Sequence, residues 1–468
     1  MTIRIMSLAA LSLAFSAVGA QQPAQSRPEL VRQIDSIAND YLATGPTASA
    51  AVAVVRGNDT IVMRGYGYAN MAAKRRAGPT TVYEIGSITK QFTSSAIMRL
   101  VEQGKINLDD DVSKYVPGFP LHGRHVAIRQ LLNHTSGIHN YTAKHEWQPH
   151  WAEDLTTDSI VGFVKQDTLD FAPGTKWSYS NTGYVLLGMV VEKASGKPYA
   201  TYLHEQFFKP LGLRQTRYCP SHAPDTTFAT GYSIKDGQLV PSAYLSMTHP
   251  FSAGALCSTV RDFLVWQRAL NNSGRVVSAH SYALMTTPDT LANGTRLTYG
   301  FGLGVSQIGS HRMISHGGGI NGFTTAQLWV PDDTLSVIMF TNTDSRSPDG
   351  AAVNIARAVL GLPFVQPPRA PPAVPLDPAL RDQVVGTYAF KVPDGSTLTI
   401  HVYAEGERLM SKADLPGQDA FPLVYYGNNT FGAGFDPSMR LAFVIESGHA
   451  SRATLTQGGA TMEGTRKP

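Results

Sequence analysis

The spacing of hydrophobic residues predicts a helix, a β-hairpin and a second helix in the first part of the chain. Pro28–Leu42 places apolar side chains at steps of three and four, as in an amphipathic helix. Ala48–Val55 and Thr60–Tyr68 are rich in β-forming residues and flank an Arg-Gly-Asn-Asp turn, so they should pair as a hairpin. Ser87–Glu102 has helical spacing again, and Gly104 is placed to end that helix.

Strand-like segments return after a long region of mixed helix and loop that extends to about residue 290. A short segment around Val353–Val359 then has the spacing of a closing helix. Because both ends of this part of the chain supply strands and helices lie between them, we predict an α+β fold with one mostly antiparallel sheet. The expected late strands are Tyr299–Ser306, His311–Ser315, Phe323–Val330 and Leu335–Asn342.

A proline-rich segment separates this part from the C-terminal residues. Seven prolines lie within residues 362–378, a density that excludes a helix or a central strand and predicts a stiff linker. We therefore expect a first domain at residues 21–361, the linker at 362–378 and a small all-β barrel or sandwich at 379–468. The expected strands of this last domain are Val385–Phe390, Thr397–Tyr403, Phe421–Tyr426, Leu441–Ile445 and Ala453–Thr456.

Residues 1–20 have the pattern of a secretory signal peptide. Arg4 gives a positive start, Ile5–Val18 is apolar, and Val18-Gly19-Ala20 ends in the small residues that a signal peptidase requires. An N-terminal membrane anchor is the alternative, but the apolar run is shorter than a bilayer span. We therefore expect a secreted or periplasmic protein with no transmembrane segment after signal cleavage.

Composition and charge exclude several classes of protein. With 43% hydrophobic and 16% charged residues, the chain is neither disordered nor a charge-rich coiled coil. The net charge is only +4, and the tightest basic cluster is Lys74-Arg75-Arg76, so we expect no nucleic-acid partner. The only two cysteines, Cys219 and Cys257, can form a disulfide in an oxidising compartment; two buried free thiols are the alternative.

One candidate for chemistry is the only Ser-x-x-Lys in the chain, Ser87-Ile-Thr-Lys90. Positions i and i+3 share a helix face, so Lys90 Nζ can reach Ser87 Oγ and accept or relay its proton. Gly86 permits close backbone approach, and the helix N-terminus favours a developing oxyanion. Most such tetrapeptides are ordinary helix surface, so the motif is weak by itself.

Two further motifs complete the set of candidates. Tyr179-Ser-Asn181 follows a Pro-Gly turn and precedes an apolar helical run, which places Tyr179 on a loop where its phenol can act as a general base. His316-Gly-Gly318-Gly319 is the only His-x-Gly and should lie at the end of a strand, where glycines let a ligand approach the backbone. Taken singly, the His316–Gly319 motif also fits a glycine-rich connection with an incidental histidine.

Together, Ser87-x-x-Lys90, Tyr179-x-Asn181 and His316-x-Gly318 resemble the serine β-lactamase and penicillin-binding protein superfamily, most closely its class C and DD-peptidase-like branch. The resemblance covers about residues 29–360 and implies an antiparallel sheet flanked by helices, with a mainly helical subdomain. The residues after 379 resemble the lipocalin-like barrel attached to some of these hydrolases. Supporting segments are Leu-Leu-Asn-His-Thr-Ser-Gly at 131–137, Phe-Ala-Pro-Gly at 171–174, Tyr-Gly-Phe-Gly at 299–302, and Ser258-Thr259 followed by Asp262.

The resemblance also implies a role for each motif residue. Ser87 would be the acylated nucleophile, Lys90 its proton-relay partner and Tyr179 the general base and acid. Asn181 would orient the substrate amide or Lys90, and the backbone N–H groups of Ser87 and Gly319 would form the oxyanion hole. No cofactor is implied.

His316 departs from the lysine that many members of the superfamily carry at this position. A histidine with a pKa near about 6.5 is mostly neutral at pH 7, so recognition of a substrate carboxylate should be weaker than with lysine. This favours the branch of D-amino-acid peptidases and esterases over efficient β-lactam hydrolysis. If the charge of His316 assists, activity should change between about pH 5.5 and 7.5.

The histidine-rich segment His122–His150 contains six of the 14 histidines but does not predict a metal site. His145-Glu-x-x-x-His has the wrong spacing for the zinc-protease helix, and Pro149 would break that helix. The aromatic residues of this segment should instead belong to a loop that lines or covers the cleft, or else decorate the surface. They are Tyr141, Trp147 and Trp151.

The sequence thus predicts an exported serine hydrolase that acts through a Ser87 acyl-enzyme on a small molecule or short peptide. The candidate substrates are a D-amino-acid peptide, including a cell-wall peptide, a small ester or a β-lactam. The alternatives are a penicillin-recognising receptor that is acylated with little turnover, or a true class C-like β-lactamase. An α/β-hydrolase is disfavoured because the chain has no Gly-x-Ser-x-Gly. The sequence leaves the oligomeric state open, and the C-terminal module fits a lid, a substrate filter or an oligomerisation element.

Overall fold

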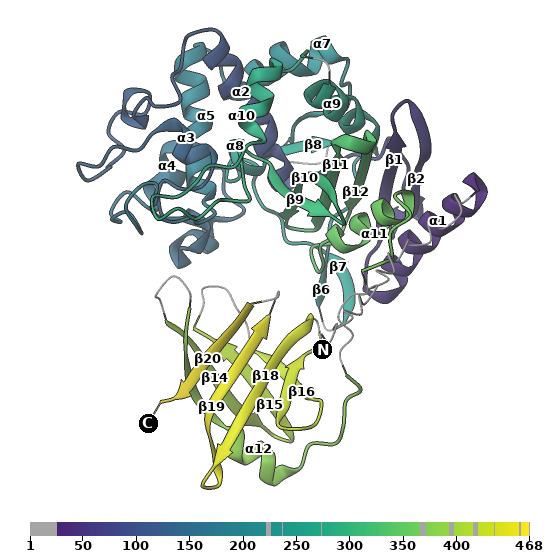
Figure 1. The fold of residues 1–468 in the computed structure, drawn as a ribbon, viewed down its shortest axis with the longest axis vertical. Coiled ribbons are helices and arrows are strands. Elements are labelled where there is room, and N and C mark those ends of the chain that lie inside the picture. Colours follow the sequence, from purple (N-terminus) through teal and green to yellow (C-terminus); the bar gives the residue numbers. More distant parts are fainter. Residues whose placement is uncertain are drawn as a thin grey trace, which may run out of the picture.

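The computed structural model describes residues 26–220, 226–235, 237–272, 274–365, 371–392, 397–414, 420–434, 436–457 and 460–467. Figure 1 shows a large part built from a sheet and helices, and a barrel formed by the C-terminal residues. The predicted signal peptide lies outside the described residues. No helix in the described ranges is both long and apolar enough to cross a bilayer.

A seven-stranded antiparallel sheet is the centre of the larger part, in the order β3-β2-β1-β12-β11-β10-β9. Strands from the two ends of this part meet in the middle of the sheet, where Ala50 pairs with Thr341 and Arg56 with Leu335. The strands are β1 (Ser49–Arg56), β2 (Asp59–Asn70), β3 (Arg75–Arg76), β9 (Gly304–Ile308), β10 (His311–Ile320), β11 (Phe323–Val330) and β12 (Leu335–Thr341).

Alternate side chains of β1 pack into two different cores, one on each face of the sheet. Ala50, Val52 and Val54 join one core, and the intervening Ala51, Ala53 and Val55 join the other. Because successive side chains of a strand point to opposite faces, this run of small apolar residues fits a strand covered on both sides. Helices α1 (Arg27–Thr44) and α11 (Asp349–Val359) cover the first face (Figure 1).

The chain between β2 and β9 forms the helices that cover the other face. Helix α2 (Thr89–Glu102) is buried along most of its length, and Phe92 stacks on Trp266 with ring centroids 3.9 Å apart. The remaining α-helices here are α3 (Ile128–Leu132), α4 (Thr157–Gly162), α5 (Asn181–Ser195), α6 (Tyr199–Leu203), α7 (Lys209–Leu211), α8 (Phe251–Gly254), α9 (Val260–Asn272) and α10 (Ala279–Met285). The same part of the chain also forms two small sheets. One has three strands in the order β4 (Tyr83–Glu84), β8 (Leu256–Ser258) and β5 (Arg217–Tyr218), and the other pairs β6 (Tyr232–Lys235) with β7 (Gln238–Pro241).

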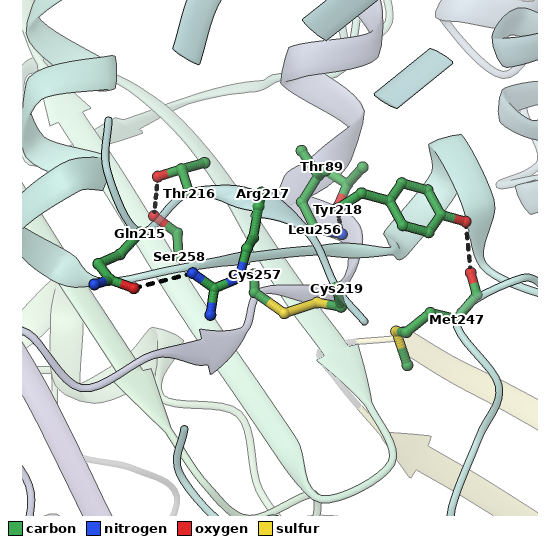
Figure 2. The surroundings of a disulfide bond; sticks show 10 residues. All are labelled: Thr89, Gln215, Thr216, Arg217, Tyr218, Cys219, Met247, Leu256, Cys257 and Ser258. Carbon is green, nitrogen blue, oxygen red and sulfur yellow. Dashed lines mark hydrogen bonds between the residues drawn. A yellow bond between two sulfur atoms is a disulfide. The ribbon is translucent and has the colours of Figure 1, made fainter. Parts of the chain in front are cut away.

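A disulfide joins Cys219 to Cys257 beside the start of α2, with the two Cα atoms 5.2 Å apart (Figure 2). Cys257 lies on β8, which pairs with β4 on one side and β5 on the other. The preceding residue, Leu256, donates its backbone N–H to Thr89 Oγ1 at 3.1 Å. The cross-linked strand is therefore bonded directly to the first residue of α2.

The C-terminal residues form a closed eight-stranded antiparallel barrel with a core of its own. Aromatic side chains such as Tyr388, Phe431 and Phe443 fill its interior. Helix α12 (Pro378–Val384) precedes it, capped by Asp377, which accepts the N–H of Ala379. The strands are β13 (Gly386–Lys391), β14 (Thr397–Glu405), β15 (Arg408–Ala413), β16 (Phe421–Tyr425), β17 (Thr430–Ala433), β18 (Asp436–Glu446), β19 (His449–Gln457) and β20 (Ala460–Arg466).

The predicted α+β class, with its antiparallel sheet and C-terminal barrel, is confirmed, whereas several element boundaries were wrong. The strand expected from residue 299 begins only at Gly304, and the one expected to end at Ser315 continues to Ile320. Helix α12 and strands β15, β17 and β20 were not predicted. Gly, polar or charged residues interrupt these strands in the sequence, so their apolar alternation is short.

Removal of the disulfide should destabilise the larger part of the molecule. A Cys219→Ala/Cys257→Ala variant loses a cross-link across 38 residues, so the unfolded chain gains freedom and the free energy of unfolding should fall by about 2–4 kcal/mol. Thermal unfolding with and without reductant measures this. The variant should melt at the temperature of the reduced wild type and be insensitive to reductant. An oxidised wild type that melts no higher than the variant contradicts the expectation.

Candidate active site

Ser87 lies in a single 3₁₀ turn, Gly86–Ile88, between β4 and α2. The helix predicted from Ser87 therefore begins two residues later, at Thr89. Gly86 has φ +51°, and a Cβ at this position would lie 2.9 Å from the backbone nitrogen of Gly319 on β10. A glycine is required here both by the positive φ and by this close approach. The turn that carries Ser87 thus rests directly against β10.

The glycine run of β10 is the surface that receives this turn. A Cβ on Gly318 would lie 2.1 Å from the carbonyl oxygen of Ile85, and Thr325 Oγ1 donates to the same oxygen at 3.0 Å. His316–Gly319 lies at the end of a strand, as the sequence suggested, but it is part of that strand: it pairs with Gln327–Thr324 of β11, and β10 continues to Ile320. Strand β9 pairs with the other edge of β10 only as far as Ser315, so beyond that residue this edge faces the Ser87 turn.

Lys90 is fully buried and contacts Ser87, as its spacing predicted. Its Nζ lies 3.1 Å from Ser87 Oγ, 2.8 Å from Asn181 Oδ1 and 2.9 Å from the carbonyl oxygen of Ala253. Burial lowers the pKa of Lys90 well below its usual value, because the charged form loses its hydration. A neutral amine is therefore favoured beside the Ser87 hydroxyl.

Tyr179 and Asn181 flank the N-cap of α5 and reach the same place. Ser180 caps the helix by accepting the N–H of Gly183 at 3.2 Å, so the preceding Tyr179 lies on the loop, as predicted. The Tyr179 ring centroid lies 4.7 Å from Lys90 Nζ, and the Ser87 side chain is close enough to Tyr179 to act on its pKa in the lowering direction. Burial nevertheless raises the pKa of Tyr179, so the phenol stays protonated near pH 7.

His134, to which the sequence gave no role, holds the loop of Tyr179 from both sides. Its carbonyl oxygen accepts the N–H of Ser178 at 3.0 Å, and its Nδ1 accepts the N–H of Ser180 at 3.1 Å. Its ring packs on that of Tyr179 with centroids 4.3 Å apart. Burial, followed by the nearby Lys90 and His316, lowers the pKa of His134, so the ring is neutral. In the sequence, only the Leu-Leu-Asn-His-Thr-Ser-Gly segment, which contains His134, pointed to a role for this residue in the site.

His316 is held in one tautomer by two hydrogen bonds. Its Nδ1–H donates to the carbonyl oxygen of Gly317 at 2.5 Å, and its Nε2 accepts the hydroxyl of Tyr299 at 2.8 Å. Burial first, and the neighbouring Lys90 second, lower the pKa of His316 to about 4. The ring is therefore neutral across the range from about pH 5.5 to 7.5 in which sequence reasoning expected its charge to change.

The histidine-rich segment does not assemble a metal centre. His122, His139 and His150 hydrogen-bond to different partners, the Asp167 backbone and the Asp170 and Glu153 carboxylates respectively. Among the described residues, no three His, Cys, Asp or Glu side chains gather as metal ligands. The aromatic residues of the segment do line the cleft, because Tyr141 and Trp147 share a cavity with Ser87, and Trp151 packs behind Trp147.

Comparison with known proteins identifies the family of this chain. The model of the Beta-lactamase family matches residues 34–362. The chain belongs to this family. It is a serine hydrolase, and the three motifs that suggested the resemblance all fall inside the matched region.

Relatives within the family include penicillin-binding proteins and D-amino-acid hydrolases. A penicillin-binding protein of Bacillus subtilis is 30% identical over 77% of this chain and 83% of its own length. A D-aminopeptidase of Brucella canis is 28% identical over 73% of this chain, which spans only 64% of that longer protein. The solved structure of a D-stereospecific amidohydrolase from Streptomyces matches with a TM-score of 0.61 and 28% identity, covering 72% of this chain and all of that one.

Between about pH 5.5 and 7.5, the pH profile of this serine hydrolase should contain no step from His316. The folded pKa of about 4 lies below the usual value of 6.5, so the neutral ring loses its stabilising contacts only as the pH falls toward 4. We expect His316→Asn to lower kcat/KM about tenfold through loss of the Tyr299 contact without changing the profile's shape in that range. Measuring kcat/KM against pH for both proteins tests this. A step near pH 6.5 that only the wild type shows would overturn the neutral assignment.

Proposed function

We propose that this protein hydrolyses amide or ester bonds through an acyl-enzyme formed on Ser87. The observation that carries the proposal is the contact of a buried amine with one hydroxyl: Lys90 Nζ lies 3.1 Å from Ser87 Oγ, and the Tyr179 ring centroid lies 4.7 Å from the same Nζ. A serine hydroxyl needs such a neighbour to remove its proton before it attacks a carbonyl. Membership of the Beta-lactamase family supports this assignment.

The contacts of Lys90 support its role as the proton acceptor in the first step. A neutral amine has two N–H groups and one lone pair. The two oxygens of Asn181 and Ala253, at 2.8 and 2.9 Å, only accept hydrogen bonds and therefore occupy both N–H groups. The lone pair is left for the Ser87 hydroxyl. Because burial also disfavours the charged form, the amine is poised to take that proton.

In the proposed reaction, Ser87 Oγ transfers its proton to Lys90 Nζ while it attacks the substrate carbonyl carbon. The leaving nitrogen or oxygen then takes a proton from the Tyr179 phenol, which Lys90 replaces. The resemblance made Tyr179 both general base and acid, and its raised pKa keeps the phenol protonated, so it has a proton to give in this step. Water finally attacks the acyl carbon and gives a proton to the Lys90–Tyr179 pair. The bond between that carbon and Ser87 Oγ then breaks, Oγ takes the proton back from the pair, and the carboxylic acid leaves.

The backbone around Gly319 supports an oxyanion site. We assign the developing negative charge to the N–H groups of Ser87 and Gly319, which the contact of Gly86 with Gly319 brings next to each other. Gly319 is exposed at the open edge of β10 and is accessible to a substrate. Asn181 would then hold Lys90 through its Oδ1 and face the substrate from the same cavity.

Among the candidate substrates, D-amino-acid amides or peptides and small esters fit better than β-lactams. His316 is neutral and its Nε2 already accepts the Tyr299 hydroxyl, so it provides no cation for a substrate carboxylate. The relatives described as a D-aminopeptidase and a D-stereospecific amidohydrolase agree with this choice. An acylated receptor with little turnover is the alternative that the following experiment distinguishes.

Ser87→Ala should abolish both turnover and covalent labelling. We expect kcat/KM for a p-nitrophenyl ester and a D-amino-acid p-nitroanilide to fall by at least about 1,000-fold. Mass spectrometry after a fluorophosphonate treatment should place the adduct on Ser87 in the wild type. Ser36→Ala, an exposed serine on α1, is the matched control and should keep full activity. Turnover by Ser87→Ala would overturn the mechanism, and one stable adduct per wild-type molecule would favour the receptor.

We also propose that the protein is exported and processed after Ala20. The signal-like pattern of residues 1–20 and the disulfide both support an oxidising destination. Expression of the full chain in a bacterial host should give periplasmic or secreted protein that begins at Gln21, as measured by N-terminal sequencing and intact mass. Retention of Met1–Ala20 on active, disulfide-bonded protein would contradict this proposal.

A further inference from the structure

A cavity that Ser87 helps to line has a volume of about 150 Å³. A cavity of about this size accommodates a group as large as benzene. Among the described residues, its lining includes no Asp, Glu, Lys, Arg or His. The lining residues are Ser87, Tyr141, Thr142, Trp147, Asn181, Leu245, Pro250, Ala253, Gly254, Gly319, Ile320 and Asn321.

Tyr141 and Trp147 form an aromatic wall in this cavity. Their rings meet edge to face, with centroids 5.2 Å apart and planes 88° apart. Trp151 supports Trp147 from behind at 5.5 Å. Both wall residues are almost completely buried, so their positions are set by packing and not by solvent contacts.

One buried histidine, His249, holds this aromatic wall in place. Trp147 Nε1 donates to His249 Nδ1 at 2.8 Å, and the Tyr141 hydroxyl donates to the His249 carbonyl oxygen at 2.8 Å. Because Nδ1 accepts, the ring proton is on Nε2, which donates to the carbonyl oxygen of Glu153 at 2.7 Å. The following residue, Pro250, itself lines the cavity.

The neutrality of the lining limits the groups that can enter. A free ammonium or carboxylate in this cavity would lose water and find no oppositely charged partner on its walls, which is costly. An apolar group would instead replace water against aromatic and aliphatic side chains. The site therefore discriminates against substrates with a charge beside the scissile carbonyl.

We propose that this cavity is the acyl subsite, that it takes an uncharged, ring-sized apolar acyl group, and that His249 is its positioning residue. The proposal rests on the assignment of Ser87 as the nucleophile. It narrows the substrate class to esters or amides of arylalkyl acids and to N-acylated aromatic D-amino acids. A free α-amino group is disfavoured.

The first test compares p-nitrophenyl phenylacetate with p-nitrophenyl acetate. Wild type should favour phenylacetate in kcat/KM by about tenfold or more, and Trp147→Ala should reduce that preference about tenfold, mainly through KM. Trp147→Phe retains a ring and should keep most of the preference. Val265→Ala, an exposed apolar residue on α9, should leave it unchanged. A preference that Trp147→Ala does not alter overturns the subsite.

The second test addresses His249 through a pair of variants. His249→Asn keeps an acceptor near the position of Nδ1 and should retain most of the preference for phenylacetate, whereas His249→Leu removes the acceptor and should lose it. Active-site titration with a fluorophosphonate and thermal unfolding identify any variant that fails to fold. If the His249→Leu variant is folded, reacts with the fluorophosphonate and still keeps the wild-type preference for phenylacetate, His249 is not a positioning residue.

The third test addresses charge at pH 7. N-acetyl-D-phenylalanine p-nitroanilide should be cleaved with a kcat/KM at least about tenfold above that of D-phenylalanine p-nitroanilide. A preference for the free amine would overturn the neutral subsite. Failure of the mechanism is distinguishable from failure of this inference. Turnover by Ser87→Ala overturns the mechanism, whereas Ser87-dependent turnover that prefers charged or small acyl groups overturns only the subsite.

Discussion

The close contact between the Ser87 turn and the glycine run of β10 is the constraint on which the site depends. Gly86 approaches Gly319, and Gly318 leaves space for the carbonyl of Ile85, so neither partner tolerates a larger side chain. The backbone of Ile85 is also bonded to Leu256 on β8, which is bonded in turn to Thr89. The nucleophile is thus fixed between the main sheet and the disulfide-linked strand before α2 begins, and Lys90 follows one helical turn later.

Burial then gives the site its chemical character by removing charge from it. The same desolvation lowers the pKa of Lys90, His134 and His316 and raises that of Tyr179 and Tyr299. The two histidines and the two tyrosines are therefore uncharged at neutral pH, and Lys90 is shifted toward its neutral amine. Lys90 can then take the Ser87 proton only as Ser87 attacks and negative charge passes to the substrate oxygen, and the lining of the acyl cavity adds no charged side chain.

Local periodicity and motif spacing predicted those helices, strands and contacts that depend on residues close together in the sequence. The Ser87–Lys90 contact follows from i,i+3 spacing, although the chain there is a 3₁₀ turn that leads into α2. His134 and His249 could not be assigned a role in the same way, since His249 meets Trp147 from 102 residues away and His134 acts on a loop 46 residues later. The charge state of His316 likewise depends on tertiary burial, which a sequence pattern does not contain.

The pairing of β1 with β12 has a consequence for the life of the newly made chain. At the centre of the sheet Ala50 pairs with Thr341. The helices between them are therefore synthesised before β12, at a time when the sheet that they cover is still incomplete. Such long-range pairing delays folding until synthesis of this part is complete and leaves the apolar β1 exposed meanwhile. Until β12 has been made, β1 can pair only with β2, and the backbone groups on its other side have no partner strand.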